Sequence, residues 1–258
     1  MVAKREAIQR QALQVEWSDE GLVLGARRLG ETDAVVELFT PMQGRRAGLV
    51  HGGAGKRRRA VVEPGATVAA TWKARTEDRL GFFQPIEATR SRSAALLDDP
   101  AALAALQATL ALLQTVTAER QPYPGLHEAT LVLLDALAEA PDWPALYVRW
   151  EAGLLAALGY GLDLSQCAAT GATDDLTHVS PRTGRAVSAE AAAPYLDRLH
   201  RLPGFLLAAQ NPIETGDVAD GFALTGSFLE SRALHPAMKD LPEARSRLIV
   251  MLGRAGRL

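Results

Sequence analysis

The spacing of the apolar residues changes near residue 90, and this change limits the chain to a two-part fold. From residue 16 to about residue 89, apolar and polar side chains alternate in short runs, as in the run from Val35 to Phe39 and the run from Val68 to Trp72. Glycine and proline residues separate these runs. Five short strands within about 75 residues are typical of a small barrel or sandwich, and a closed barrel would leave no exposed strand edges.

After residue 90 the apolar residues recur at helical spacing. Asp99 and Pro100 form a helix start signal, and leucines follow at positions 103, 106, 110 and 113. Further helices are predicted at about 125–139, 142–158, 189–202, 222–234 and 242–254, with Gly159 ending the third helix. We therefore predict an extension (residues 1–15), an all-β domain (residues 16–90) and an all-α helical domain (residues 91–258). An irregular segment at 164–191 interrupts the helical domain.

Charge and cysteine content point to a cytoplasmic protein with one cationic domain. Residues 1–90 carry 15 Lys and Arg against 11 Asp and Glu, whereas residues 91–258 carry 13 against 19. A positive first part and a negative second part suggest that only the first faces a polyanion. The single cysteine, Cys167, excludes an internal disulfide and fits a reducing compartment. The longest uncharged run, 101–118, is rich in alanine and polar residues, so we interpret it as a buried helix and expect no membrane association.

Several catalytic motifs fail at required positions. The glycines before Lys56 resemble a phosphate-binding loop, but that loop needs a glycine where Val50 stands and a hydroxyl where Arg57 stands. The pair His127-Glu128 lacks the second histidine of a zinc protease, because position 131 is leucine. No serine lies between glycines in a nucleophile elbow. We therefore expect a non-enzymatic protein without a cofactor, although an enzyme of another type that acts on nucleic acid is an alternative.

Basic residues cluster in the predicted β domain, most densely in the run from Lys56 to Arg59 after a glycine-rich turn. Loops and one sheet face of a small barrel are where oligonucleotides bind in oligonucleotide-binding folds. Solvated surface charge is the alternative for the scattered pairs. Trp72 points away from the basic face of its strand and is predicted to be core, while Phe82 and Phe83 face opposite sides. The predicted DNA-binding residues are Arg27, Arg28, Arg45, Arg46, Lys56, Arg57, Arg58, Arg59, Lys73 and Arg75.

Four stretches, in order, resemble the RecO family of recombination mediators. They are residues 19–33 (DEGLVLGARRLGETD), residues 39–53, residues 63–72, and residues 158–164 (LGYGLDL), which lead to Cys167. The resemblance covers about residues 17–167. It implies an oligonucleotide-binding fold followed by a helical domain. It also implies binding of single- and double-stranded DNA, annealing of complementary strands and a nucleoid location. The implied partners are RecR, the acidic tail of single-stranded DNA-binding protein and, indirectly, RecA.

The sequence departs from the family at the zinc motif. Many members carry two Cys-x-x-Cys pairs after the Leu-Gly-Tyr segment, and the corresponding positions here are Cys167, Thr170, Ser188 and Ala191. One thiolate out of four cannot close a tetrahedral zinc site, so we predict no metal. The segment must then keep its shape through packing and hydrogen bonds, for which the turn at residues 180–184 is a candidate.

A second basic group lies in the otherwise acidic helical domain, beside the apolar residues 248–252. It consists of Arg232, Lys239, Arg245 and Arg247. A basic rim around an apolar groove suits an acidic peptide that ends in an aromatic residue. The alternative is that this domain only supports the barrel. For the whole chain, the alternative to a DNA-binding mediator is a protein-interaction adaptor whose barrel binds no DNA.

Overall fold

The computed structural model describes residues 15–258, so the predicted extension at residues 1–15 lies outside the described residues except for Val15. The chain folds into two compact units. The first contains the residues up to Leu97 together with Thr117–Leu131, and the second contains Asp98–Val116 and Val132–Leu258. Among the described residues, no helix combines the length and the apolar character that crossing a membrane requires.

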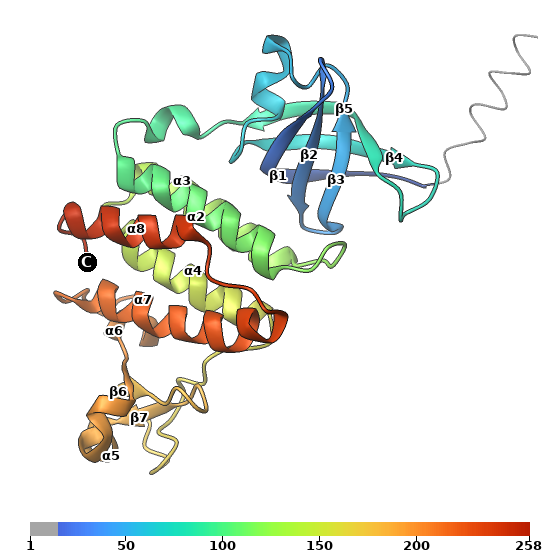
Figure 1. Ribbon diagram of the computed structural model, residues 1–258. Coiled ribbons are helices and arrows are strands. Elements are labelled where there is room, and N and C mark those ends of the chain that lie inside the picture. The colour runs from blue at the N-terminus through green and yellow to red at the C-terminus, as the bar shows by residue number, and fades with distance from the viewer. Residues whose placement is uncertain (1–14) are drawn as a thin grey trace, which may run out of the picture. The chain divides into compact units, whose positions relative to one another are not determined.

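Five strands close into a barrel in the first unit, in the order β1-β2-β3-β5-β4 (Figure 1). All neighbouring strands are antiparallel except β3 and β5, which run parallel. This confirms the all-β N-terminal domain and decides for the barrel over the sandwich. The strands are β1 (Val15–Leu29), β2 (Asp33–Thr40), β3 (Gly44–Val50), β4 (Thr67–Ala74) and β5 (Gly81–Arg90).

Alternate residues of the strands fill the barrel. Val36, Leu38, Val68, Trp72 and Phe83 are all 2% exposed or less and belong to one apolar cluster. Trp72 is therefore core, as its alternation with Lys73 predicted. Phe83 is buried and its neighbour Phe82 is half-buried, because successive side chains of a strand point to opposite faces.

Two glycines allow the barrel to close around its aromatic core. Gly48 of β3 and Gly81 of β5 are paired across the parallel seam. A Cβ atom on Gly48 would come within 2.6 Å of the Phe83 ring, and one on Gly81 would come within 2.3 Å of the Trp72 ring. The strands can meet here only because neither residue has a side chain.

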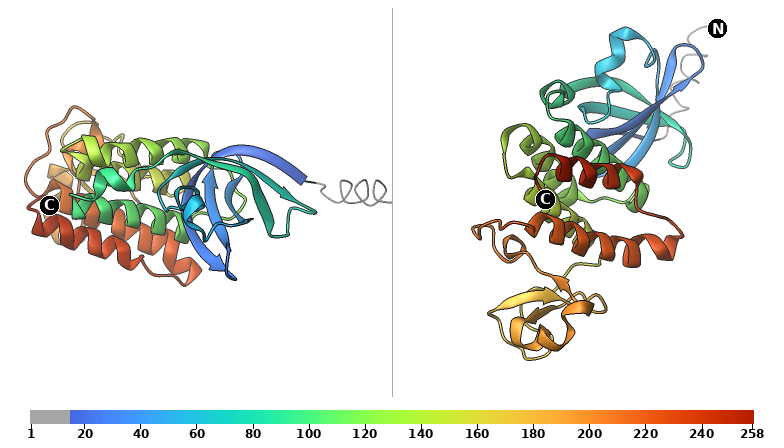
Figure 2. Two further views of the ribbon diagram at one scale, coloured as in Figure 1. Left: turned by 90° about the horizontal axis from the view of Figure 1, so that it is seen from above. Right: turned by 60° about the vertical axis from the view of Figure 1, so that its left-hand side comes forward.

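The second unit is mainly helical, which confirms the predicted fold class. Asp99 caps the first helix as predicted, since its Oδ1 accepts hydrogen bonds from the backbone N–H groups of Ala101 and Ala102. Gly159 has a φ of 86° after the third helix, which suits its predicted role as a terminator. In Figures 1 and 2, α2 lies beside α8, and α4 lies beside α7. The longer helices of this unit are α2 (Pro100–Val116), α4 (Trp143–Ala157), α7 (Asp217–Phe228) and α8 (Glu243–Arg254). A further helix, α3 (Pro124–Glu139), belongs to the first unit up to Leu131 and to the second unit from Val132.

The irregular segment and the residues just after it form a small sheet that the periodicity did not predict. Its strands are β6 (Leu176–Val179), β7 (Ala186–Ser188) and β8 (His200–Arg201), in the order β7-β6-β8 (Figure 2, right). The predicted helix at 189–202 is wrong in extent, because α5 covers only Ala189–Ala192. Pro194 follows, and Tyr195 has non-helical backbone angles, so the chain continues as a short 3₁₀-helix and then as β8.

Cys167, in the irregular segment, is buried and hydrogen-bonded. Its Sγ accepts hydrogen bonds from the backbone N–H and the hydroxyl of Ser188, at 3.3 and 3.4 Å. The backbone N–H of Cys167 donates to the carbonyl of Ala172 at 2.7 Å, and that of Gly184 donates to Ser180 at 2.8 Å. Two of the four positions of the family's zinc motif, 167 and 188, thus contact each other directly. Within residues 15–258, no cluster of three or more His, Cys, Asp or Glu side chains could hold a metal ion.

Candidate nucleic-acid interface

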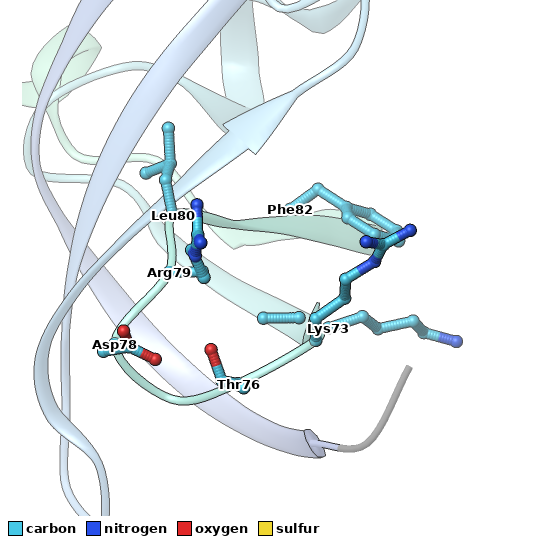
Figure 3. Close-up of a pocket in the computed structure, with 8 residues that line it drawn as sticks. Lys73, Thr76, Asp78, Arg79, Leu80 and Phe82 are labelled. Carbon is cyan, nitrogen blue, oxygen red and sulfur yellow. The ribbon is translucent and has the colours of Figure 1, made fainter. Parts of the chain in front are cut away.

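The turn between β4 and β5 forms a shallow pocket of about 640 Å³ on the barrel unit. Figure 3 shows that its side chains come from the adjoining ends of both strands and from the turn itself, with Lys73 and Phe82 extending on the same side. Lys73 and Phe82 are register partners across β4 and β5. The lining consists of Lys73, Ala74, Arg75, Thr76, Asp78, Arg79, Leu80 and Phe82.

The pocket is cationic. Arg75 and Arg79 are exposed, and no carboxylate of the described residues lies within ion-pair distance of either side chain. Lys73 is partly engaged, since its Nζ lies 3.2 Å from Glu16 Oε1. Asp78 is the one acid in the lining, and a hydrogen bond from the Thr76 hydroxyl lowers its pKa, so it is ionised at neutral pH. Three cations beside a half-buried aromatic ring suit a nucleotide, whose phosphate is anionic and whose base has an apolar face.

A second group of cations lies at the turn between β1 and β2 and on the loop that follows β3. Arg27 and Arg28 end β1 and are exposed, and the Arg28 guanidinium donates to the carbonyl of Glu31. The loop is fixed to this turn because the backbone N–H groups of Ala54 and Gly52 donate to Thr32 O and Asp33 Oδ1, both at 2.9 Å. The hydrogen bond from Gly52 is the main cause of the lowered pKa of Asp33.

The same loop carries the basic run on 3₁₀-helix η1 (Lys56–Val61). Lys56, Arg58 and Arg59 are exposed, and no carboxylate of the described residues is within ion-pair distance of these three side chains. The side chain of Arg57 lies outside the described part of the structure. Lys56, Arg58 and Arg59 are thus presented to solvent from a defined helical turn.

His51 and Phe82 connect the two groups of cations. The ring of His51, at the start of the loop, lies 6.4 Å from the ring of Phe82, centroid to centroid. His51 is also held by Asp33, at 3.2 Å from Nδ1 to Oδ2. The surface from the β1–β2 turn to the β4–β5 turn, through these two rings, is called the basic path here. Its described cations are Arg27, Arg28, Lys56, Arg58, Arg59, Lys73, Arg75 and Arg79.

Two of the predicted DNA-binding residues are not available on this surface. Arg45 is largely buried, forms an ion pair with Glu37 and donates to the carbonyl of Thr117 at 3.1 Å. Arg46 is 7% exposed and lies over the ring of Trp72. Arg45 and Arg46, which were predicted to bind DNA, are therefore not among the exposed cations of the basic path, because each side chain is enclosed by protein partners.

Sequence reasoning also missed two residues of the basic path, Arg79 and His51. Arg79 directly follows Glu77 and Asp78, so the local net charge is not positive and does not indicate a basic cluster. His51 is one of five histidines that are scattered along the sequence. The sequence signal for both residues is a glycine close by, Gly52 for His51 and Gly81 for Arg79, because glycines separate the predicted strands and the ends of strands come together at turns.

The four cations predicted for a peptide site in the helical unit have different environments. Arg247 and Lys239 are exposed, and the Lys239 Nζ donates to the carbonyl of Thr115 at 2.7 Å. Arg232 is half-buried and donates to the carbonyl of Arg182. Arg245 is 4% exposed and bridges α8 to α4 through Glu151, with 2.7 Å from Nε to Oε1. The prediction of Arg245 as an exposed rim residue is thus wrong, since it is a buried ion-pair partner.

A groove of about 330 Å³ nevertheless lies beside Arg245, between α7 and α8. The guanidinium of Arg245 lies 5.2 Å from the centre of the Phe222 ring. A Cβ atom on Gly226 would come within 2.9 Å of Arg245 Nη1, so glycine at this position leaves space next to the guanidinium. The lining consists of Ala219, Phe222, Ala223, Gly226, Ser227, Glu230, Leu241, Arg245 and Ile249. The groove is mainly apolar, with the buried cation at one wall.

Comparison with known proteins relates both units to one family. Residues 13–92 match the family model described as Recombination protein O N terminal, and residues 97–242 match Recombination protein O C terminal. The chain belongs to the RecO family. DNA repair protein RecO of Hyphomonas neptunium is 52% identical over 236 residues, which cover 91% of this chain and 97% of the relative. DNA repair protein RecO of Phenylobacterium zucineum is 52% identical over 244 residues, covering 95% of this chain and all of the relative.

Membership of the RecO family confirms the resemblance seen in the sequence motifs and supports a role in recombinational DNA repair. The five-stranded barrel is the RecO N-terminal domain with its oligonucleotide-binding-like fold. Because the two matched regions lie on either side of residues 93–96, the switch in periodicity near residue 90 lies close to the boundary between them.

Proposed function

We propose that this RecO-family chain binds single- and double-stranded DNA along the basic path and anneals complementary strands without enzymatic activity. With RecR, it would assist the loading of RecA onto strands covered by single-stranded DNA-binding protein. The basic path supports the DNA-binding part of this proposal. Its exposed cations surround a half-buried aromatic ring, and most of them have no carboxylate partner among the described residues. Arginine suits this role because it binds phosphate oxygens and also stacks on bases.

Binding of the purified protein to labelled oligothymidylate across a salt series tests this proposal. If about five to eight phosphates are neutralised, the log–log salt slope will be about −3.5 to −5.5, because each phosphate of a single strand contributes about −0.7. The adaptor alternative, in which the barrel binds no DNA, predicts weak binding with little salt dependence. A shallow slope would therefore reject DNA binding in favour of the adaptor.

We further propose that the groove between α7 and α8 binds the acidic C-terminal tail of single-stranded DNA-binding protein. An apolar groove accepts the hydrophobic end of such a tail, and Arg247, which is exposed on α8, supplies positive charge for its carboxylates. Glu230 is the one acid in the lining. The carboxylates of the tail would therefore bind at the part of the groove away from Glu230, where they are not repelled.

Blocking the groove should weaken tail binding. Ala223 is exposed and lines the groove, so Ala223→Trp fills it without disturbing the core of the unit. We expect the affinity for an acidic peptide that ends in phenylalanine to fall roughly tenfold, measured by fluorescence anisotropy. Ser246→Trp is the matched control, because it adds the same indole to an exposed position of α8 outside the lining. Equal peptide affinities for the two variants would place the tail site elsewhere.

A further inference from the structure

A smaller pocket of about 190 Å³ in the barrel unit shares Asp78, Arg79 and Leu80 with the pocket of the basic path. Its remaining lining comes from β3, from Trp72 and Glu77, and from residues 119–120 of the segment that follows α2. The two pockets therefore both border the β4–β5 turn.

Arg46 lies in this pocket with unused hydrogen-bonding capacity. It is 7% exposed, and its guanidinium carbon lies 5.3 Å from the centre of the Trp72 ring. Its Nη1 donates to the carbonyl of Glu77 at 3.3 Å. Its Nε is buried without a hydrogen-bond partner among residues 15–258, and no carboxylate in that range is within ion-pair distance. A buried guanidinium with an unpaired N–H is unfavourable unless an anion completes it.

Arg120 places a second cation at the same pocket. Its backbone has a φ of 62°, which is uncommon for a residue with a side chain, and its N–H donates to the carbonyl of Arg45 at 3.1 Å. The pKa of Arg46 is lowered first by burial and then by the charge of Arg120, which acts on it more strongly than those of Glu77 and Glu119. Two guanidinium groups that repel each other beside an unpaired N–H form an arrangement that an anion would stabilise.

The acidic residues of the lining restrict which anion fits. Glu77, Asp78 and Glu119 are exposed, and Arg45 is already neutralised by Glu37. The three other arginines of the lining are therefore balanced by three carboxylates. A dianion such as a phosphate monoester would be repelled by these carboxylates, whereas the repulsion of a monoanion is weaker. We propose that this pocket binds one phosphodiester group of the DNA backbone, with Arg46 Nε and Arg120 as its donors, an assignment that rests on the proposed DNA binding.

The test follows the Arg46 Nε–H signal by NMR while dimethyl phosphate, a phosphodiester monoanion, is added to the full chain. We expect this signal to shift in the wild type and to stay unchanged in Arg120→Asn, a variant whose asparagine tolerates the positive φ. Arg120→Asn should also weaken oligothymidylate binding roughly tenfold and make the salt slope shallower by about 0.7, the contribution of one phosphate.

A matched pair of acid substitutions separates this pocket from general electrostatics. Glu119→Gln removes a carboxylate of the lining and should tighten oligothymidylate binding roughly two- to fivefold, whereas Glu214→Gln removes an exposed carboxylate of the second unit and should change it less. No shift of the Arg46 signal, or wild-type affinity and slope in Arg120→Asn, would overturn the proposal. If the wild type binds no oligothymidylate but dimethyl phosphate shifts Arg46, the pocket stands and the proposed DNA binding fails.

Discussion

Replacing Arg245 with alanine should lower the free energy of unfolding by about 3–5 kcal/mol, because the change leaves the carboxylate of Glu151 buried without its charge partner. Glu151 is fully buried on α4. It accepts two hydrogen bonds from the Arg245 guanidinium, at 2.7 and 2.9 Å, and a third from the hydroxyl of Thr225 on α7. Urea unfolding followed by far-UV circular dichroism measures the effect, since the helical unit dominates that signal.

Two control variants show whether the loss comes from the unpaired charge. Arg247→Ala removes an exposed arginine from the same helix, so the free energy of unfolding should change by less than about 0.5 kcal/mol. The double variant Glu151→Leu with Arg245→Met replaces both charges with apolar side chains and should recover most of the stability. If Arg245→Ala unfolds at the wild-type urea concentration, the buried pair does not hold α4, α7 and α8 together.

This ion pair shows why part of the predicted peptide site was misplaced. The apolar face of α8 contains Ala244, Leu248 and Leu252, and Arg245 lies next to this face in a helical projection. A local pattern therefore suggests an arginine at the edge of the exposed side. What buries it is Glu151, a partner 94 residues earlier in the chain. The sequence contained one signal, since Glu151 falls within the apolar stripe of α4 and a charge at such a position needs a buried partner.

The barrel was predictable because strand alternation records which side chains face the core. Trp72 and Lys73 illustrate this, since one is core and the other lines the pocket at the β4–β5 turn. Arg45 and Arg46 were not predictable in the same way. Adjacent residues of a strand face opposite sides, and here each side is covered, one by Glu37 and Thr117 and the other by Trp72 and Glu77. Partners of this kind depend on the closed barrel and on the segment after α2, which no local pattern encodes.

The basic run on η1 should contribute the largest single part of DNA binding. Replacing Lys56, Arg57, Arg58 and Arg59 with alanine removes up to four phosphate contacts, so the log–log salt slope on oligothymidylate should become shallower by up to about 3. The affinity should fall without much change in sequence preference, because contacts to phosphates do not read bases. Annealing of complementary strands should decrease in parallel, since holding two strands together requires neutralising their mutual repulsion.

The control for this variant must match its loss of four positive charges. Four exposed arginines of the second unit serve this purpose when they are replaced together with alanine. They are Arg182, Arg198, Arg201 and Arg254. If general electrostatic attraction caused the binding, both quadruple variants would lose similar affinity and slope. If the basic path carries the DNA, only the variant of η1 loses them.

Folding should survive in the η1 variant, because substitutions of exposed residues usually change the free energy of unfolding by less than about 0.5 kcal/mol. The loop itself is held by backbone hydrogen bonds from Gly52 and Ala54 to the β1–β2 turn, and the substitutions leave these intact. A loss of binding can therefore be assigned to the side chains of η1 once circular dichroism shows a wild-type fold. A folded variant that keeps the wild-type affinity and slope would remove η1 from the DNA path. The cations around Phe82, namely Lys73, Arg75 and Arg79, would then have to account for the binding that remains.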